Sequence, residues 1–310
     1  MSSASGIYSY SVFGLNVASE IHLPELVACL LTGEPSDRAD VTITRGEVPA
    51  RLDQPNLELP WLSIGKDAFL MSLPNNVRFL VENGSRITVE VPLGIPTSSF
   101  SVYILCSAFG AVFHQRGILA LHAGVVKVGD RCALFCGESK AGKSTLTRGL
   151  VDRGYAMQGD DLGVIRFAKD GSPLVYPAYP QMKLWADALE HFGEATDTRE
   201  RILPELDKYA IPMVQSFNDT PLPIGKIYII SAGSDAEVEL KPIRGIEKLG
   251  NLIDHTYRIE FLRAMEQEKT FFPVVKELVP HIRMDRLLRP RGMEHMNAVL
   301  DMLEQDFSQW

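Results

Sequence analysis

The sequence predicts an α/β chain in two parts: a small strand-rich α+β domain over residues 1–95, and a core built on a mixed sheet over residues 96–310. Short alternating apolar runs bounded by turn residues dominate the first part, which is typical of strands. The second part combines strand-like runs with helical patterns, which is typical of an α/β core. A chain of 310 residues is long enough to bury two separate cores.

The net charge narrows the range of partners. Its formal value of −8 means that the molecule as a whole repels nucleic acid and anionic membrane surfaces. The one basic stretch, "HIRMDRLLRPRG", has no interleaved aromatic residues for base stacking. We therefore expect neither a nucleic-acid nor a membrane partner, and an anionic substrate must be held by a local cluster of donors.

The cysteines and the N-terminus indicate a cytoplasmic protein. Cys132 and Cys136 have a metal-like spacing, but no second pair of cysteines or histidines matches it, so all four cysteines are expected to be reduced thiols. The segment "MSSASGIYSYSVFG" lacks the basic and apolar regions of a secretory signal. No apolar run reaches the roughly 20 residues of a membrane-spanning helix.

Two elements mark the end of the first part. The segment "VRFLVENGSRITVEV" has two alternating runs joined by Asn83-Gly84, a dipeptide that favours a two-residue hairpin turn because both positions need φ > 0. A helix then starts at Thr97 or Ser98 and ends near Gly117. Its buried face is expected at Phe100, Ile104, Ala108 and Val112. We expect the domain boundary just before this helix.

After this helix, the second part continues with a hairpin. In "GILALHAGVVKVGDRCALFC" the pair Gly129-Asp130 separates two apolar runs, and the second run leads into a glycine-rich segment. Strands are expected at "GVIRF" and "KIYIIS", and helices late in the chain, with interruptions at Pro273 and Pro280. The segment "MEHMNAVLDMLEQ" is expected to form a terminal amphipathic helix.

The segment "GESKAGKS", residues 137–144, fits the pattern G-x-x-x-x-G-K-[ST] of a phosphate-binding loop. Such a loop turns backbone N–H groups at a helix N-terminus toward a phosphate. Lys143 would add a charge for the β- and γ-phosphates, and the Ser144 hydroxyl a ligand for Mg²⁺. The alternative is an ordinary strand–turn–helix unit. The residues expected to bind ATP are Gly137, Glu138, Ser139, Lys140, Ala141, Gly142, Lys143, Ser144 and Thr145.

Two adjacent carboxylates follow closely, Asp160 and Asp161 in "QGDDLG", with room for only one short helix and one short strand after Ser144. Adjacent side chains of a strand point to opposite faces, so a bend is needed to bring both near one site. One carboxylate would then hold Mg²⁺ and the other accept a proton from a hydroxyl. The alternative is a solvated acidic turn. A lone histidine among apolar neighbours, such as His122, is usually a satisfied core residue.

The run "LHAGVVKVGDRCALFCGESKAGKSTLTRGLVDRGYAMQGDDLGVI" resembles the HPr kinase/phosphorylase family, which shares its core fold with phosphoenolpyruvate carboxykinase. A weaker match lies at "LLRPRGMEHMNAVLDML". The resemblance implies an HPr kinase/phosphoenolpyruvate carboxykinase-like P-loop core. It also implies that Asp161, His122 and Lys143 are catalytic: Asp161 as the base, His122 near the reacting phosphate, and Lys143 on the phosphates. Ser144 and Asp160 would bind the metal.

Three basic residues are candidate contacts to substrate or phosphate. Arg289 and Arg291 match the family's late basic segment, and Lys208 lies in "LDKYAIP". The alternatives are a solvated basic turn for the two arginines and an exposed linker residue for the lysine.

The sequence also departs from the HPr enzymes. They carry a Glu-x-Arg-Gly-Leu-Gly signature after the aspartates, whereas this chain has "YPAYPQMKLWADALEHFG", and its N-terminal part is unlike their first domain. These departures leave HPr as acceptor and the reverse phosphorolysis without support from the sequence. The layout is more similar to the HPr-kinase-like enzymes of lasso peptide clusters, which phosphorylate the C-terminal serine of a precursor peptide. The segments "YSVFGLNVASEIHLPEL", "YPQMKLW" and "LDKYAIP" carry this similarity.

These observations predict a Mg²⁺- and ATP-dependent kinase that transfers the γ-phosphoryl group to a serine hydroxyl, with a small peptide as its partner and a homo-oligomer as one arrangement of the chain. Two alternatives stay open. One is a kinase for free serine or another small hydroxylated metabolite. The other is a regulator that binds ATP with little chemistry, although a pure sensor has no need of a base.

Overall fold

The computed structural model describes residues 6–31, 39–232 and 237–310. The chain divides into two compact units. The first consists of Met1–Leu119 and Arg258–Val274, and the second of Ala120–Tyr257 and Val275–Trp310. No helix within the described ranges is both long and apolar enough to cross a membrane.

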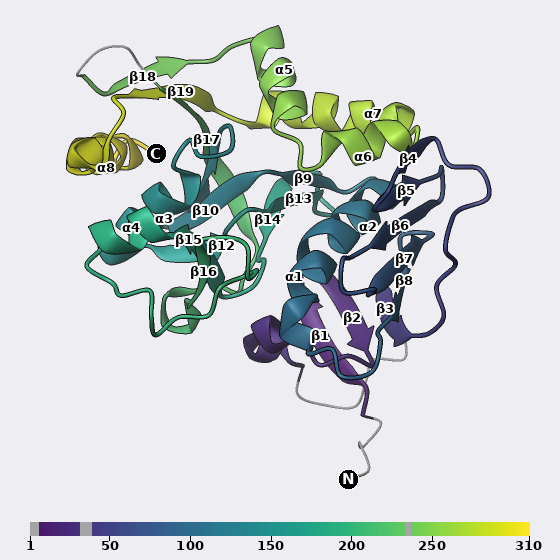
Figure 1. Ribbon diagram of the computed structural model, residues 1–310. Helices are drawn as coiled ribbons and strands as arrows, with labels where there is room; N and C mark the ends of the chain where they lie inside the picture. The colour runs from purple at the N-terminus through teal and green to yellow at the C-terminus, as the bar shows by residue number, and fades with distance from the viewer. Residues whose placement is uncertain (1–5, 32–38, 233–236) are drawn as a thin grey trace. The chain divides into compact units, whose positions relative to one another are not determined.

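An eight-stranded mixed sheet forms the first unit (Figure 1). The pairs β2–β3 and β3–β8 are parallel, and the other neighbours are antiparallel. In order across the sheet, the strands are β1 (Tyr8–Val12), β2 (Leu15–Ser19), β3 (Val41–Arg45), β8 (Arg86–Glu90), β7 (Arg78–Glu82), β6 (Ala68–Ser72), β5 (Leu62–Ile64) and β4 (Leu57–Leu59).

The hairpin expected around Asn83-Gly84 is confirmed as β7–β8. Both residues have positive φ, 55° and 60°, as the sequence predicted. The register pairs Glu82 with Arg86, so the loop has three residues and not two. Ser85 joins the turn by donating its backbone N–H to the Glu82 carbonyl at 3.2 Å.

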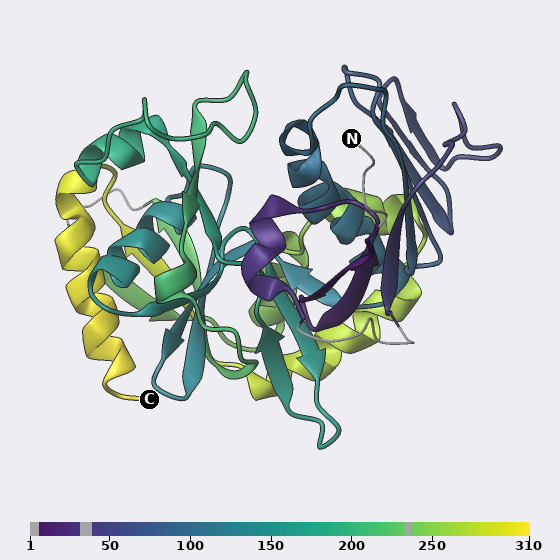
Figure 2. The ribbon, with the colours of Figure 1, turned by 90° about the horizontal axis from the view of Figure 1, so that it is seen from below.

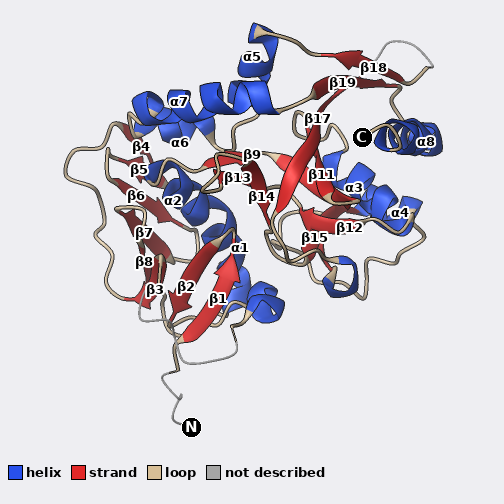
Figure 3. Cartoon of the chain, turned by 180° about the vertical axis from the view of Figure 1, so that it is seen from behind, coloured by secondary structure: helices blue, strands red, loops and turns tan. Residues whose placement is uncertain are grey.

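The expected buried helix is also present, and it packs within the first unit. Phe100, Ile104, Ala108 and Val112 are all buried. The helical run comprises a 3-10 turn (Thr97–Ser99), α1 (Ser101–Tyr103), a π-helical segment (Ile104–Ala108) and α2 (Phe109–Gln115). Figure 3 shows α1 and α2 against the sheet of this unit.

The division of the chain therefore differs from the boundary expected between residues 95 and 96. The physical reason is aromatic packing: Phe13 contacts Phe109 and Phe113, and Phe79 contacts Phe100. These contacts bury the helix against strands of the first unit. A later helix, α6 (Ile259–Ala264), also returns to this unit and contacts α2.

A nine-stranded mixed sheet forms the second unit. Strand β17 pairs in parallel with β11 and with β19, and β10 runs antiparallel to β11. The main path across the sheet is β12 (Ala156–Gly159), β10 (Ala123–Val128), β11 (Arg131–Cys136), β17 (Leu222–Ala232), β14 (Pro173–Tyr176), β13 (Gly163–Phe167) and β9 (Leu119–Leu121). Strand β19 (Met284–Arg289) pairs with β17, and β18 (Glu239–Pro242) pairs with β19.

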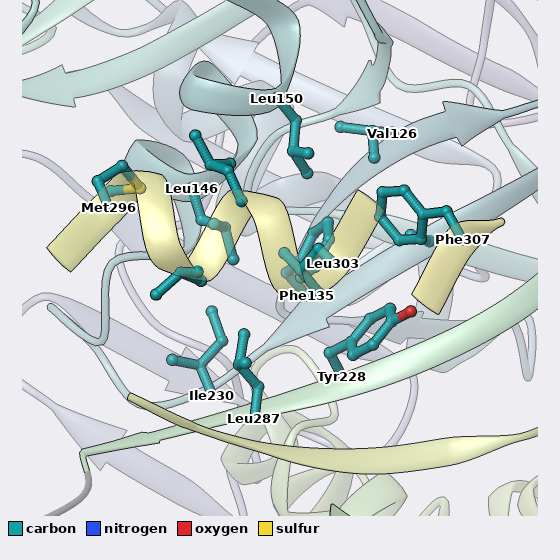
Figure 4. Packing of buried hydrophobic residues seen from close by; sticks show 13 residues of the cluster. Val126, Phe135, Leu146, Leu150, Tyr228, Ile230, Leu287, Met296, Leu303 and Phe307 are labelled. Carbon is teal, nitrogen blue, oxygen red and sulfur yellow. The ribbon is translucent and has the colours of Figure 1, made fainter. Parts of the chain in front are cut away.

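Helices α3 (Lys143–Asp152) and α8 (Met296–Phe307) lie side by side on this sheet (Figures 1 and 2). Figure 4 shows their apolar side chains directed toward Phe135, Tyr228 and Leu287 of the strands. The terminal amphipathic helix is thereby confirmed as α8. This core fixes α3, and with it the segment between β11 and α3.

Three smaller elements complete the second unit. Strands β15 (Gln181–Trp185) and β16 (Lys208–Pro212) form a separate antiparallel pair. Helix α4 (Ala186–His191) directly follows β15, and α5 (Ile246–Asp254) follows β18 along the chain.

The expected interruption at Pro273 is wrong. Helix α7 (Glu268–Leu278) runs through this residue and ends just before Pro280. A proline inside a helix leaves the carbonyl four residues earlier without its usual donor. Pro273 and Lys269 are both exposed, so water can satisfy that carbonyl and the helix continues.

Candidate active site

The glycine-rich segment connects β11 to α3. It occupies residues 137–142, and Lys143 is the first residue of α3. Gly142 has φ 96° and Lys140 has φ 65°, so the backbone turns twice through the left-handed region. A Cβ on Gly137 would lie 3.1 Å from the Ile230 carbonyl oxygen, so this position needs a glycine to pass β17. A strand, a loop and a helix thus lie at the positions predicted from the sequence.

Lys143 folds back over this loop. Its Nζ donates to the carbonyl oxygens of Gly137 and Glu138 at 2.9 and 3.0 Å. The residue is only 7% exposed, and this burial lowers the pKa of its ammonium while Asp161 opposes the shift. The charge of Lys143 is therefore fixed beside the loop by the loop's own backbone.

Arg289, the last residue of β19, covers the other side of the loop. Its Nη2 donates to the Ala141 carbonyl at 3.1 Å, and a Cβ on Gly142 would lie 2.6 Å from the same nitrogen. Burial lowers the pKa of its guanidinium from the usual value. Arg291, two residues further on, is exposed.

The two aspartates lie in a tight turn after β12. A Cβ on Gly159 would lie 2.6 Å from the Leu162 carbonyl oxygen, and Asp161 adopts φ 67°. Because Asp161 lies in the left-handed region, the chain reverses its direction there, and the two carboxylates are directed apart. Asp160 is buried at 4% exposure, whereas the Asp161 side chain is 17% exposed.

Asp160 has one satisfied oxygen and one unsatisfied oxygen. Its Oδ2 accepts a hydrogen bond of 2.8 Å from the backbone N–H of Lys183. Its Oδ1 is buried and has no hydrogen-bond partner within the part of the chain that the structure describes. Burial raises the pKa of Asp160, and the neighbouring Asp161 adds to the shift. A buried carboxylate oxygen of this kind is suited to a cation.

Three basic side chains surround Asp161. Lys183 Nζ lies 3.2 Å and Lys208 Nζ 3.9 Å from its Oδ2, and His122 Nε2 lies 3.7 Å from its Oδ1. Burial alone would raise the pKa of this carboxyl, but Lys183, His122 and Lys208 hold it well below its usual range. Asp161 is therefore an ionised carboxylate at neutral pH.

These groups meet at a cavity of about 410 Å³ in the second unit, which falls in the size range of small-molecule sites. It brings together most of the side chains predicted from the sequence. Its lining consists of His122, Ser139, Lys140, Gly142, Lys143, Ser144, Thr145, Asp161, Trp185, Ala186, Asp187, Asp207, Lys208, Arg289 and Met293.

The remaining predicted residues lie outside this described lining. Gly137, Glu138 and Ala141 contribute the backbone of the loop, and Asp160 is buried next to Asp161 in the chain. Arg291 is exposed and does not join the lining. The structure therefore brings Lys208 and Arg289, but not Arg291, to the cavity.

Two residues of β15 were missed by the sequence analysis. Lys183 is 3% exposed, and Trp185 has Lys140 Nζ and Lys208 Nζ at 5.5 and 5.9 Å from its ring centroid. The available signal was a lysine within the apolar run "QMKLW". Lysine is rarely buried without a charged partner, so this position pointed to a carboxylate nearby.

Comparisons with known proteins find matches among solved structures. No family model matches the chain, and no curated protein matches it in sequence. Among solved structures, the chain is similar to the Hpr(Ser) kinase/phosphatase from Coxiella burnetii. The match has 11% identity and a TM-score of 0.33, and covers 62% of this chain and 99% of that one.

Proposed function

We propose that this chain is a Mg²⁺- and ATP-dependent phosphotransferase that moves the γ-phosphoryl group to a serine hydroxyl. One observation carries the proposal: an ionised carboxylate, Asp161, and the glycine-rich loop at the N-terminus of α3 line the same cavity. A loop of this type binds phosphates, and a carboxylate beside it can accept a proton from a hydroxyl.

The loop side of the cavity is suited to a triphosphate. Lys140, Lys143 and Arg289 bring three positive charges to the lining, and α3 begins there. Backbone N–H groups at a helix N-terminus favour anions, and cationic side chains add to that preference. The net charge of the chain is negative, so an anionic substrate needs a local cluster of donors, and these three side chains are such a cluster.

Two oxygens are suited to Mg²⁺. They are the buried Asp160 Oδ1 and the Ser144 hydroxyl, which lines the cavity. Mg²⁺ in such sites commonly takes one or two protein oxygens and completes its shell with water and phosphate oxygens. When bound, it neutralises charge on the phosphates. We assign Ser144 and Asp160 to this role.

Asp161 would act as the base. It accepts the proton of the acceptor hydroxyl, whose oxygen forms a bond to the γ-phosphorus while the bond from that phosphorus to the ADP oxygen breaks. Lys143 and His122 lie at the same cavity and supply positive charge or a hydrogen-bond donor to the transferred oxygens. The protein thus contributes position and charge, which is most of what phosphoryl transfer requires.

The proposed acceptor is the C-terminal serine of a lasso-type precursor peptide. This follows from the resemblance in sequence. Lys208 lies at the cavity 3.9 Å from Asp161, where a cation would suit the terminal carboxylate of such a peptide. Free serine also has a hydroxyl and a carboxylate, so it is the second candidate.

Intact-mass spectrometry tests the proposal. The protein is incubated with Mg²⁺, ATP and one acceptor at a time: a lasso-type precursor ending in serine, the same peptide ending in alanine, HPr, and free serine. We expect a gain of one phosphate on the serine-ended peptide alone. A gain on free serine alone would replace the acceptor and keep the chemistry. ATP binding without a gain on any acceptor would favour a regulator and contradict the proposed reaction.

A further inference from the structure

Lys183 contacts both aspartates of the turn, by two different groups. Its backbone N–H donates to Asp160 Oδ2 at 2.8 Å, and its Nζ donates to Asp161 Oδ2 at 3.2 Å. One residue of β15 therefore fixes two carboxylates that diverge from each other. Asp161 itself lies in a backbone region that an L-residue rarely adopts.

Because Lys183 is buried, its ammonium loses its hydration when the ion pair with Asp161 forms. Removing Asp161 would leave that buried charge without compensation. The Lys183 side chain is 4% exposed, and a buried ammonium is tolerated only when a charged partner and hydrogen bonds compensate its desolvation. Asp161 provides the compensation. The Tyr179 ring, with its centroid 5.9 Å from Nζ, offers a further cation–π contact. Strand β16 holds the segment in place through the pairing of Lys183 with Ala210.

The three basic side chains around Asp161 are not equivalent. His122 and Lys208 line the cavity, at 3.7 and 3.9 Å from the carboxylate, so each can turn toward a bound ligand. Lys183 is closer to the carboxylate, and the described lining of the cavity does not include it. Its ammonium is therefore directed at Asp161 and not at substrate.

We infer that Lys183 is a positioning residue of the transfer reaction: its ammonium holds the Asp161 carboxylate toward the acceptor, while its backbone N–H leaves Asp160 Oδ1 free for the metal. This inference rests on the proposed function. It adds a residue that neither the loop motif nor the paired aspartates indicate.

The two contacts can be separated by mutation. The backbone N–H is retained in any variant except proline, so Lys183→Met keeps the bond to Asp160 and removes only the ammonium. Methionine also fills most of the volume of the lysine side chain and leaves little cavity. Lys183→Arg restores a positive charge at the same position.

The matched control is Lys226→Met. Lys226 is also a buried lysine of the second unit, 7% exposed, and its Nζ contacts Asp285 and Asp306 at 2.9 and 2.8 Å. It is not part of the described lining of the cavity. The control reproduces the loss of a buried ion pair without touching Asp161.

The experiment measures kcat with the serine-ended peptide, the Kd of Mg²⁺-ATP by calorimetry, and the Tm, on the full chain. For Lys183→Met we expect kcat to fall about 100-fold, the effect of misplacing a reacting group by roughly 1 Å. The Kd should stay within about threefold, because a group that acts only in the transition state does not alter ground-state binding. Lys183→Arg should recover at least part of the lost kcat. Lys226→Met should lower the Tm and keep kcat close to that of the unchanged protein.

Three results would overturn the inference. If Lys183→Met keeps the kcat of the unchanged protein, the ammonium has no positioning role. If kcat, Kd and Tm all deteriorate, and Lys226→Met does the same, Lys183 is only structural. If the unchanged protein transfers no phosphate to any acceptor, the proposed function fails and the role of Lys183 fails with it. The first two results leave the proposed function intact, so the two failures are distinguishable.

Discussion

At the scale of single residues, a change at the Asp161 carboxylate tests catalysis separately from the binding of ATP. The carboxylate lines the cavity, and in our proposal the loop backbone and Lys143 bind the phosphates of ATP. We expect Asp161→Asn to retain ATP affinity and to lose turnover by about 10²–10⁴-fold, the usual contribution of a general base. Calorimetry and initial rates measure the two effects. Asp170→Asn, in an exposed turn, is the control. Normal turnover of Asp161→Asn would remove Asp161 from the mechanism.

Gly142 offers a second test at this scale. An alanine there meets a positive φ of 96° and a Cβ position 2.6 Å from Arg289 Nη2. We expect Gly142→Ala to displace Arg289 and weaken ATP binding by about tenfold or more, one charge-assisted contact being worth roughly 1.5–3 kcal/mol. Gly154→Ala is the matched control, with φ 97° and no described atom within 4 Å of its Cβ. Equal losses of affinity in the two variants would mean that backbone strain, and not Arg289, is responsible.

At the scale of elements, α8 is anchored to the sheet by a buried ionic group. Asp306 of α8 accepts from Lys226 Nζ at 2.8 Å and contacts the Tyr228 hydroxyl at 2.5 Å. Burial would raise the pKa of Asp306, but Lys226 and Tyr228 hold it below its usual range. The anchor therefore joins the end of α8 to β17.

The lowered pKa sets the direction of a pH effect on stability. A carboxyl that is more acidic in the folded state contributes stability above its unfolded pKa, about 3.9, and loses it as the pH falls through the folded value. We expect Asp306→Asn to lower the free energy of unfolding by about 1–3 kcal/mol at pH 7. The deficit should shrink below about pH 4. Urea unfolding at several pH values measures it. Asp301→Asn, more exposed on the same helix, should change stability much less, and a pH-independent deficit for Asp306→Asn would contradict the assignment.

Elements close in sequence were the ones that sequence reasoning could place. The β10–β11 hairpin, the loop before α3 and the bend at the aspartates depend on neighbouring residues, and all appear where expected. Lys183 and Lys208 reach Asp161 only because β15 and β16 pair beside the turn. That pairing joins residues more than 20 positions apart and leaves no local pattern. The helix break expected at Pro273 was wrong for another reason. The carbonyl that loses its hydrogen-bond donor there is open to water, so the proline does not end the helix.

At the scale of the whole molecule, the chain passes between its two units more than once. The sequence analysis placed the boundary at a change of pattern, before the helix that starts at Thr97. A single sequence does not reveal that the aromatic face of this helix meets Phe13, in the turn between β1 and β2, and Phe79 of β7.

This difference predicts how a fragment behaves. A chain of residues 96–310 would lose the sheet that covers Phe100, Phe109 and Phe113, all of which have no exposed surface in the intact chain. We expect that fragment to aggregate, because a large apolar surface becomes exposed. Size-exclusion chromatography of the soluble fraction measures this. A monomeric fragment that binds ATP would support the boundary at residue 95 instead.

The most direct test of the central claim is the ratio of products formed from Mg²⁺-ATP and a serine-ended precursor peptide. Phosphoryl transfer predicts one ADP for each phosphoserine throughout the time course. ADP and free phosphate without phosphopeptide would mean hydrolysis, with water as the acceptor. Bound ATP that yields neither product would contradict a phosphotransferase, and would leave the cavity as a nucleotide sensor.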